Sequence, residues 1–250
     1  MLNFAKRLIA AAFLLAALPV VAAELTVSAA ASLNNAFKEA GQAYEALHPA
    51  TKVLFNFAAS DVLVQQIAKG APVDIFASAD QEAMDKAQEQ KLILEGSRKN
   101  FVANALVLIT PLDSALKLKA LGDLQQAGVK RIALGNPAIV PAGRYAKHAL
   151  DAQKMWPALE SKAIFAQNVR QALDYVARAE VDAGFVYTTD AAIQKEKVRV
   201  AFVVPTEIPI TYPIAIVNGS AQAADAKNFI DYLQTPAGQA ILGKHGFLKP

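Results

Sequence analysis

The sequence predicts an α/β fold of two lobes, each with a mostly parallel sheet flanked by helices. From Glu24 onward, short runs of β-branched and aromatic residues alternate with segments whose apolar residues recur every three or four positions. A helix after almost every strand is typical of parallel strands with helices on both faces of the sheet. Roughly 190 residues of such units exceed one comfortable sheet, so we expect two lobes.

The first 23 residues have the pattern of a cleaved secretory signal. Lys6 and Arg7 precede an apolar run at 8–21, and small residues follow it. The run is shorter than the about 20 apolar residues that usually span a bilayer. We therefore expect residues 1–23 to be a signal peptide and the mature chain to be exported. An uncleaved N-terminal anchor is the alternative.

The composition argues against several classes of function. Of 25 basic residues, Lys6 and Arg7 leave with the signal peptide, so 23 basic residues face 22 acidic ones in the mature chain. A nearly neutral chain without a basic cluster is not expected to bind nucleic acid or an anionic membrane. The sequence has no cysteine, which excludes disulfides, thiolate metal sites, cysteine nucleophiles and a lipid-modified cysteine. Its core alone must hold the fold.

Lobe 1 is expected to begin with three strand–helix units. The expected strands are 25–29, 53–57 and 73–77. The first is followed by a helix with apolar residues spaced along 33–47, and the other two by helices starting near Ser60 and Asp80. These units place three helix starts at the same edge of the sheet.

The pattern changes in the second half of the chain. The apolar run 101–109 is expected to be one long strand, and further strands are expected at 131–134, 184–187, 198–204 and 212–217. We expect 101–109 and 208–217 to be the two crossings between the lobes, and helices within 221–242 to return to lobe 1. The expected lobes are 24–102 plus 217–250 for lobe 1 and 103–216 for lobe 2.

Two serines stand where strands of lobe 1 give way to helices. Ligands of open α/β sheets bind at the carboxyl ends of the strands, so these junctions are candidate sites. Taken alone, the position of Ser32 favours a helix N-cap. The functional alternative is that Ser32 offers its hydroxyl and amide to an anion, aided by the helix dipole. Ser60 repeats the arrangement after the second strand.

Lobe 2 offers three comparable junctions. The segment 136–150 has two prolines and a glycine at the entry to a helix. The amide of Ala142 therefore lacks a strand partner and could bind a ligand. An ordinary proline-rich helix entry has the same pattern. Asn168 is a good N-cap, with Val169 in the first turn behind it. Tyr187 ends a strand and places a phenol where the sheet stops.

Little in the sequence suggests catalysis. None of the three histidines, His48, His148 and His245, lies at a junction or has a glutamate or second histidine at metal-ligand spacing. The sequence contains no GxSxG, GxGxxG or phosphate loop ending in GK[ST]. A hydrolase or a dehydrogenase therefore has little support in the sequence, and we do not expect an enzyme.

Taken together, the junction sequences resemble those of periplasmic molybdate-binding proteins of ABC transporters. They are AAASL, FAAS, APVDIFASAD, GNPAIVPAGRYAKHAL, NVRQAL and GFVYTTDA, and the similarity covers essentially the whole mature chain. The resemblance implies a type II periplasmic-binding fold that closes on one tetrahedral dianion, molybdate or tungstate, without a cofactor. It also implies a monomer in the periplasm that delivers the ion to a membrane permease.

The resemblance further implies which residues bind the oxyanion: Ser32 and Ser60 by hydroxyl and amide, Ala142 and Val169 by backbone amide, and Tyr187 by its phenol. Molybdenum would then be held only as the oxyanion. Donors fixed at helix starts can replace the water around a dianion without a counter-charge.

Two alternatives remain open. The first is a receptor for sulfate or phosphate. Sulfate is smaller than molybdate, and phosphate carries a proton that needs an acceptor, which a cavity made only of donors does not supply. The second is an exported hydrolase with Ser32 or Ser60 as nucleophile, which would need a histidine and an acid near the serine.

Three charged residues lie beside the implied ligands. Arg144 and Arg170 follow predicted donors in first helical turns, and we expect both to project along the surface and away from the cleft. Asp61 follows Ser60, and we expect it to face outward, where the helix dipole favours an acid by about 0.3–1 kcal/mol. A carboxylate facing the cleft would repel molybdate and could accept the proton of phosphate.

Overall fold

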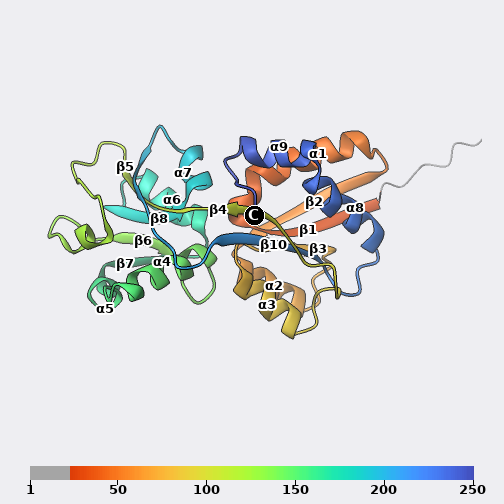
Figure 1. Ribbon diagram of the computed structural model, residues 1–250, viewed down its shortest axis with the longest axis horizontal. Helices are drawn as coiled ribbons and strands as arrows, with labels where there is room; N and C mark the ends of the chain where they lie inside the picture. Colours follow the sequence, from red (N-terminus) through yellow and green to blue (C-terminus); the bar gives the residue numbers. More distant parts are fainter. Residues whose placement is uncertain (1–22) are drawn as a thin grey trace, which may run out of the picture.

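The computed structural model describes residues 23–250, so the predicted signal peptide lies outside the described residues except for Ala23. The described chain forms two lobes, each built on a five-stranded sheet flanked by helices (Figure 1). The predicted fold class is confirmed. None of the helices within 23–250 is long and apolar enough to cross a membrane.

The first sheet has the strand order β2-β1-β3-β10-β4. Strand β1 (Ala23–Ala30) pairs in parallel with β2 (Thr51–Ala58) and β3 (Ile75–Ala77). Strand β10 (Ile210–Ile216) runs antiparallel to both β3 and β4 (Lys99–Asn104). Four strands therefore point one way and β10 points the other, which makes the sheet mixed but mostly parallel.

Helices cover both faces of the first sheet (Figure 1). On one face lie α1 (Asn34–Leu47), α8 (Ala223–Gln234) and α9 (Pro236–Lys244), and on the other lie α2 (Ser60–Ala68) and α3 (Gln81–Glu89). The last two helices of the chain thus return to the first lobe, as predicted.

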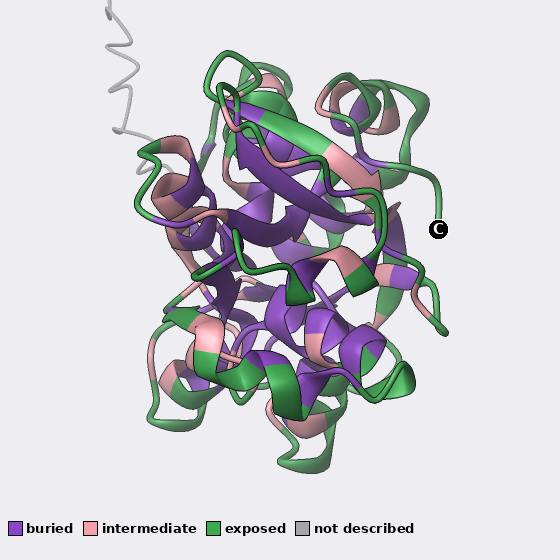
Figure 2. Cartoon of the chain, turned by 90° about the vertical axis from the view of Figure 1, so that its left-hand side faces the viewer, coloured by how far each residue is buried: buried purple, intermediate pink, exposed green. Residues whose placement is uncertain are grey.

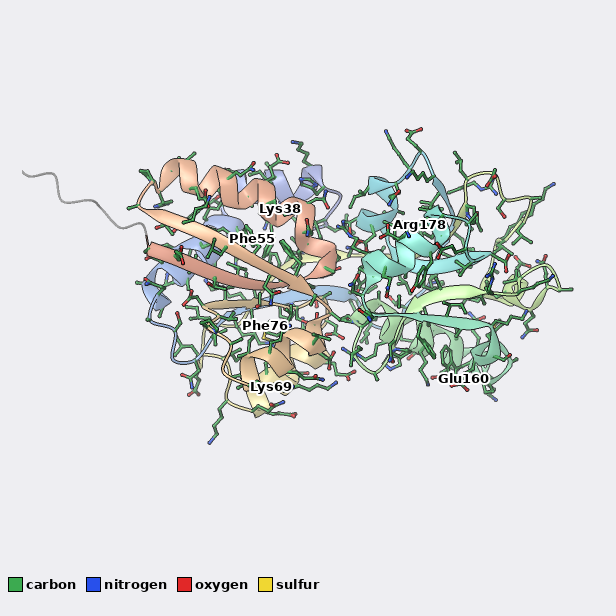
Figure 3. All side chains as sticks on the ribbon, turned by 180° about the vertical axis from the view of Figure 1, so that it is seen from behind. Lys38, Phe55, Lys69, Phe76, Glu160 and Arg178 are labelled. Carbon is green, nitrogen blue, oxygen red and sulfur yellow. The ribbon has the colours of Figure 1, made fainter. Side chains whose placement is uncertain are left out.

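The two faces of the first sheet carry separate apolar clusters because successive side chains of a strand point to opposite faces. In β3, Ile75 and Ala77 belong to the cluster that includes α1 and α8, whereas Phe76 belongs to the cluster that includes α2 and α3. Phe55 of β2 packs on the first of these clusters; it is labelled with Phe76 in Figure 3. Both faces of the sheet are therefore closed by helices.

The second sheet has the order β7-β6-β8-β5-β9. Strand β6 (Ile132–Gly135) pairs in parallel with β7 (Ala163–Ala166) and β8 (Ala183–Tyr187). Strand β5 (Leu106–Pro111) runs antiparallel to β8 and β9 (Val198–Val203). Strands β5, β6 and β8 are buried along their whole length, in the interior of the lobe that faces the viewer in Figure 2.

The second sheet is also covered on both sides. Helices α4 (Pro141–Ala152) and α5 (Trp156–Leu159) lie on one face, and α6 (Val169–Ala177) and α7 (Thr188–Ile193) lie on the other (Figure 1). Three short 3-10 turns complete the described elements: Ala31–Leu33, Leu121–Gln125 and Glu160–Lys162.

The first crossing between the lobes lies within the predicted run 101–109, but the strands around both crossings differ from the sequence prediction. The apolar run 101–109 is two strands, because the chain leaves the first sheet after β4 and enters the second with β5, with Ala105 between them. The predicted lobe 2, 103–216, includes β10, but β10 lies in the first sheet because its ladder partners are β3 and β4. The return crossing therefore lies in residues 204–209.

Strand β7 is not predicted by the sequence pattern. It has only four residues, lies at the edge of its sheet and leaves Ile164 and Phe165 exposed. A short edge strand shows too little alternation of apolar and polar residues to be recognised.

Candidate functional site

A small cavity lies between the lobes, where strands of both sheets end and helices begin. The space open to the centre of a water-sized sphere is about 10 Å³. This is about the space that one water molecule needs, so the cavity excludes an organic solute. The five residues implied by the sequence resemblance all line it: Ser32, Ser60, Ala142, Val169 and Tyr187.

The remaining lining is small and uncharged. It consists of Ala30, Ala31, Ala58, Ala59, Ala79, Val140, Pro141 and Asn168. Within the described chain, the lining therefore contains no charged side chain and no histidine. Its polar groups are hydroxyls, one phenol, one amide side chain and the backbone amides of helix starts.

Neither serine caps its own helix. Ser32 lies in the turn Ala31–Leu33, and its Oγ is 3.0 Å from the hydroxyl of Tyr212. Ser60 is the first residue of α2, and its Oγ accepts a hydrogen bond of 3.1 Å from the backbone N–H of Ala79. The cap interpretation of Ser32 is wrong, because its buried hydroxyl bonds to a distant strand and not to the helix that follows.

The amides of the second lobe lie in first helical turns, where no intrahelical carbonyl is available to accept from them. Ala142 is the second residue of α4, and Val169 is the first residue of α6. Asn168 Oδ1 caps α6 by accepting from the N–H groups of Arg170 and Gln171, at 3.0 and 3.1 Å. This cap leaves the N–H of Val169 for a ligand, and the helix dipole favours an anion there.

The phenol of Tyr187 reaches across the lobes. Its hydroxyl donates to the carbonyl oxygen of Ala79 at 3.4 Å, which is long for a hydrogen bond of this kind. Burial raises the pKa of Tyr187 well above its usual value, so the phenol keeps its proton at neutral pH. The hydroxyl is thus a donor whose present bond is weak.

Asp61 does not face solvent, which corrects the sequence prediction. The carboxylate is buried and accepts from Arg144 Nη2 at 2.6 Å and from Lys86 Nζ at 2.8 Å. Arg144 Nη2 also lies 2.8 Å from Asp80 Oδ2. Arg144 belongs to α4 of the second lobe, whereas both acids belong to the first, so this ion cluster joins the lobes.

Arg144 is likewise not on the surface, and pairing is what permits its burial. Burial by itself lowers the pKa of Arg144, but the charges of Asp80 and Asp61 outweigh this and raise the pKa above its usual value. Neither Arg144 nor Asp61 lines the cavity. The cluster therefore neither neutralises nor repels an anion there by direct contact.

Arg170 makes a second link between the lobes. It does not line the cavity, in agreement with the prediction, but its side chain is half-buried between the lobes and does not simply project along the surface. Its Nε lies 2.5 Å from Asp190 Oδ1 within the second lobe. Its Nη1 donates to Asn35 Oδ1 at 2.8 Å and its Nη2 to the carbonyl of Ser32 at 3.0 Å, both in the first lobe. The link holds the start of α6 against the turn that carries Ser32.

Three residues near the cavity carry no obvious mark in the sequence. Ala79 bonds to Ser60 and Tyr187 through its backbone alone, which no side-chain pattern can predict. Asn104 and Tyr212 lie in the segments predicted as crossings, and Tyr212 bonds to Ser32. The sequence signal that could have found Asn104 and Tyr212 is a polar group within an otherwise apolar strand. Such a group is expected to be buried and then needs a hydrogen-bond partner.

The described residues contain no group of three or more His, Cys, Asp or Glu side chains that could hold a metal ion. His245, for example, bonds to Glu39 through its Nε2 at 2.8 Å, away from the cavity. What suits the site to an anion is its own lining of neutral donors at helix starts.

Comparison with known proteins gives consistent matches over nearly the whole described chain. The family model of bacterial extracellular solute-binding proteins matches residues 25–248. The molybdate-binding protein ModA of Haemophilus influenzae is 36% identical over 229 residues, which cover 90% of each chain. ModA of Escherichia coli (strain K12) is 38% identical over 231 residues, 90% of this chain and 88% of the relative.

A solved structure with the same fold is the periplasmic molybdate-binding protein of Azotobacter vinelandii. It superposes with a TM-score of 0.79 at 25% sequence identity, covering 90% of this chain and 99% of the other. The similarity thus extends over both lobes and the cavity between them.

Proposed function

This chain belongs to the family of bacterial extracellular solute-binding proteins, and from that premise we propose that it captures molybdate between its lobes for an ABC transporter. Tungstate, an oxyanion of the same charge and shape, is the expected second ligand. As a member of this family the chain is a binding protein and not an enzyme. The observation that carries the proposal is a small uncharged cavity lined by hydrogen-bond donors from both lobes.

The physical basis is the replacement of a hydration shell. A dianion that leaves water loses a large solvation energy, which must be recovered from polar groups already held in place. Hydrogen bonds to a charged acceptor contribute about 1.5–3 kcal/mol each. The hydroxyls of Ser32, Ser60 and Tyr187 and the amides of Ala142 and Val169 are the proposed donors.

Closing of the lobes would connect binding to transport. The lobes rotate about the two crossings, Ala105 and residues 204–209, and the contacts of Arg144 and Arg170 favour the closed form. A permease that recognises the closed form then receives loaded protein in preference to empty protein. We further propose that residues 1–23 direct export to the periplasm and that the mature protein acts as a monomer.

Titration calorimetry of the mature protein with molybdate, tungstate, sulfate and phosphate tests the proposal. Molybdate and tungstate are expected to bind at least about tenfold more tightly than the other two, a difference of about 1.4 kcal/mol. Equal or tighter binding of sulfate or phosphate would instead identify a receptor for that ion. A serine hydrolase is tested by labelling with a fluorophosphonate probe, and no labelling of Ser32 or Ser60 is expected, because the described cavity lining contains no histidine or carboxylate.

A further inference from the structure

A buried carboxylate that does not line the cavity connects three of the proposed donor residues. Asp190 lies in α7 and has no exposed surface. Its Oδ2 accepts a hydrogen bond of 3.3 Å from the backbone N–H of Tyr187, and its Oδ1 lies 2.5 Å from Arg170 Nε. Arg170 follows Val169 in the first turn of α6 and donates to the carbonyl of Ser32 in the other lobe. One acid thus holds the start of α7 and, through Arg170, two further donor positions.

The contact with Asp190 determines where the guanidinium of Arg170 points. A guanidinium is planar, and its five N–H groups have fixed directions. With Nε directed at Asp190, Nη1 donates to Asn35 Oδ1 at 2.8 Å and Nη2 to the carbonyl of Ser32 at 3.0 Å. Among the ion pairs of the described chain, Asp190 is the only acidic partner of Arg170. Asp190 therefore sets the direction of both bonds that Arg170 makes to the first lobe.

A carboxylate is the side chain that fits this position. It has two oxygens that accept hydrogen bonds and no hydrogen to donate when it is ionised. An asparagine of the same shape has one oxygen and one NH₂ group, so either the N–H of Tyr187 or the guanidinium of Arg170 would face a second donor. Arg170 in turn compensates the buried charge of Asp190. The pair is therefore balanced in charge and fixed in geometry.

We propose that Asp190 is a positioning residue of the oxyanion site, which directs Arg170 at the turn that carries Ser32 and so aligns the donors of the two lobes when they close. This inference rests on the proposed oxyanion function and deepens it. The bonds from Arg170 to Asn35 and Ser32 cross between the lobes, so they require the lobes to be together. Their loss should therefore speed the release of the ion more than it slows capture.

The substitution Asp190→Asn is expected to weaken molybdate binding about 10- to 100-fold, because Arg170 then loses the direction of its charged hydrogen bonds to the first lobe. The rate of release should account for most of this change, with association altered less than about threefold. Calorimetry measures the affinity, and a chase of radiolabelled molybdate with the unlabelled ion measures release. If Asp190 only screened the charge of Arg170 from the anion, the substitution would instead tighten binding, which would overturn the inference.

Arg170→Lys tests whether Asp190 acts through Arg170. A lysine can still pair with Asp190 but lacks the planar fork that reaches Asn35 and the Ser32 carbonyl together. Binding is expected to weaken about as much as in Asp190→Asn. The variant with both substitutions should then bind no more than about threefold more weakly than either single variant. Losses that multiply in the double variant would show that Asp190 acts by another route and would refute the proposed role.

The matched control is Asp174→Asn. Asp174 lies on α6, the helix of Arg170, and accepts a hydrogen bond of 3.1 Å from Nε2 of Gln194, which follows α7. Asp174 therefore joins the same two elements, but within the described chain it makes no ion pair or hydrogen bond to the first lobe. Its substitution is expected to leave the molybdate affinity within about twofold of wild type. A loss as large as that of Asp190→Asn would contradict the positioning role.

The outcomes separate the inference from the proposed function. If the wild-type protein binds no molybdate, the proposed function fails and the role of Asp190 fails with it. If the wild-type protein binds molybdate but Asp190→Asn and Arg170→Lys bind it equally well, only the positioning role is refuted. Should Asp190→Asn not fold, Arg170→Lys decides the matter, because it leaves no buried acid without a cationic partner.

Discussion

Individual residues contribute to the proposed site in two ways, through side chains and through backbone amides. The hydroxyls of Ser32 and Ser60 are removed by a substitution to alanine, whereas the N–H of Val169 is retained in any residue except proline. Val169 also packs into the core of the second lobe through its side chain. Substitutions at these positions therefore distinguish side-chain donors from backbone donors.

Ser32→Ala and Ser60→Ala are each expected to weaken molybdate binding by about 10- to 100-fold, because each loses a hydrogen bond of about 1.5–3 kcal/mol to a charged acceptor. Val169→Ala keeps its donor and is expected to change the affinity by less than about threefold, through shape alone. Calorimetry on the three variants measures this. Equal losses in all three would contradict the assignment of Val169 as a backbone donor.

Asp61 shows the limit of local reasoning about a single residue. The helix dipole favours an acid in the first turn of α2 and does not determine which way it points. Arg144 Nη2 comes within 2.6 Å of its carboxylate from the other lobe, which compensates the burial of both charges. The carboxylate of Asp61 is therefore paired with Arg144 between the lobes. It does not line the cavity and so does not accept the proton of a phosphate bound there.

At the scale of the element, the start of α4 depends on a close approach to the end of β6. A Cβ added at Gly143 would lie 1.8 Å from the carbonyl oxygen of Gly135, a backbone atom that cannot move alone. Glycine thus allows the first turn of α4, with the amide of Ala142, to reach the cavity. The requirement is steric, since only a residue without a side chain fits between these two backbones.

Gly143→Ala is expected to destabilise the protein by about 1–3 kcal/mol, as overpacked sites do, and to weaken molybdate binding by displacing the Ala142 amide. Thermal unfolding and calorimetry on the same sample measure both effects. Gly243→Ala is the matched control, because it lies in helix α9 and a Cβ there has no neighbour within 4 Å. The steric explanation fails if both variants unfold at the same temperature and bind molybdate equally well.

Most elements are predictable from the sequence because helices and strands differ in the period of their apolar residues. The starts of α2, α3 and α6 agree with the predicted helix starts for this reason. The single apolar run at 101–109 gives no sign of its division at Ala105, because both strands are apolar and only their sheet partners differ. Periodicity identifies an element but not the sheet to which it belongs.

At the scale of the whole molecule, the lobes are joined by charged contacts that surround the cavity without lining it. Arg144 holds Asp61 and Asp80 of the other lobe, and Arg170 holds the carbonyl of Ser32. In an open form these acids would return to water. The contacts therefore stabilise the closed form relative to the open form, and their removal should shift that balance.

Arg144→Met is expected to weaken molybdate binding by about tenfold or more, because removing one partner of a buried ion pair leaves uncompensated acids at the closed interface. Small-angle scattering should then show a larger radius of gyration than wild type at subsaturating molybdate. Lys147→Met is the control on the same helix, since its exposed pair with Asp151 contributes only about 0.3–0.5 kcal/mol. Closing and binding identical to wild type in Arg144→Met would exclude this role.

The sequence by itself determined most of the strands and helices, the two-lobed class of fold and the junctions at which Ser32, Ser60, Ala142, Val169 and Tyr187 stand; it missed β7 and the division of 101–109 into two strands. The features that it determined depend on apolar spacing and helix starts, which are local properties of the chain. Only the tertiary structure decided that Arg144 meets Asp61, 83 positions away, and that Tyr212 meets Ser32, 180 positions away. A local pattern carries no information about which distant side chain will satisfy a buried charge or hydroxyl, because that partner is chosen by the packing of one lobe or one sheet against another.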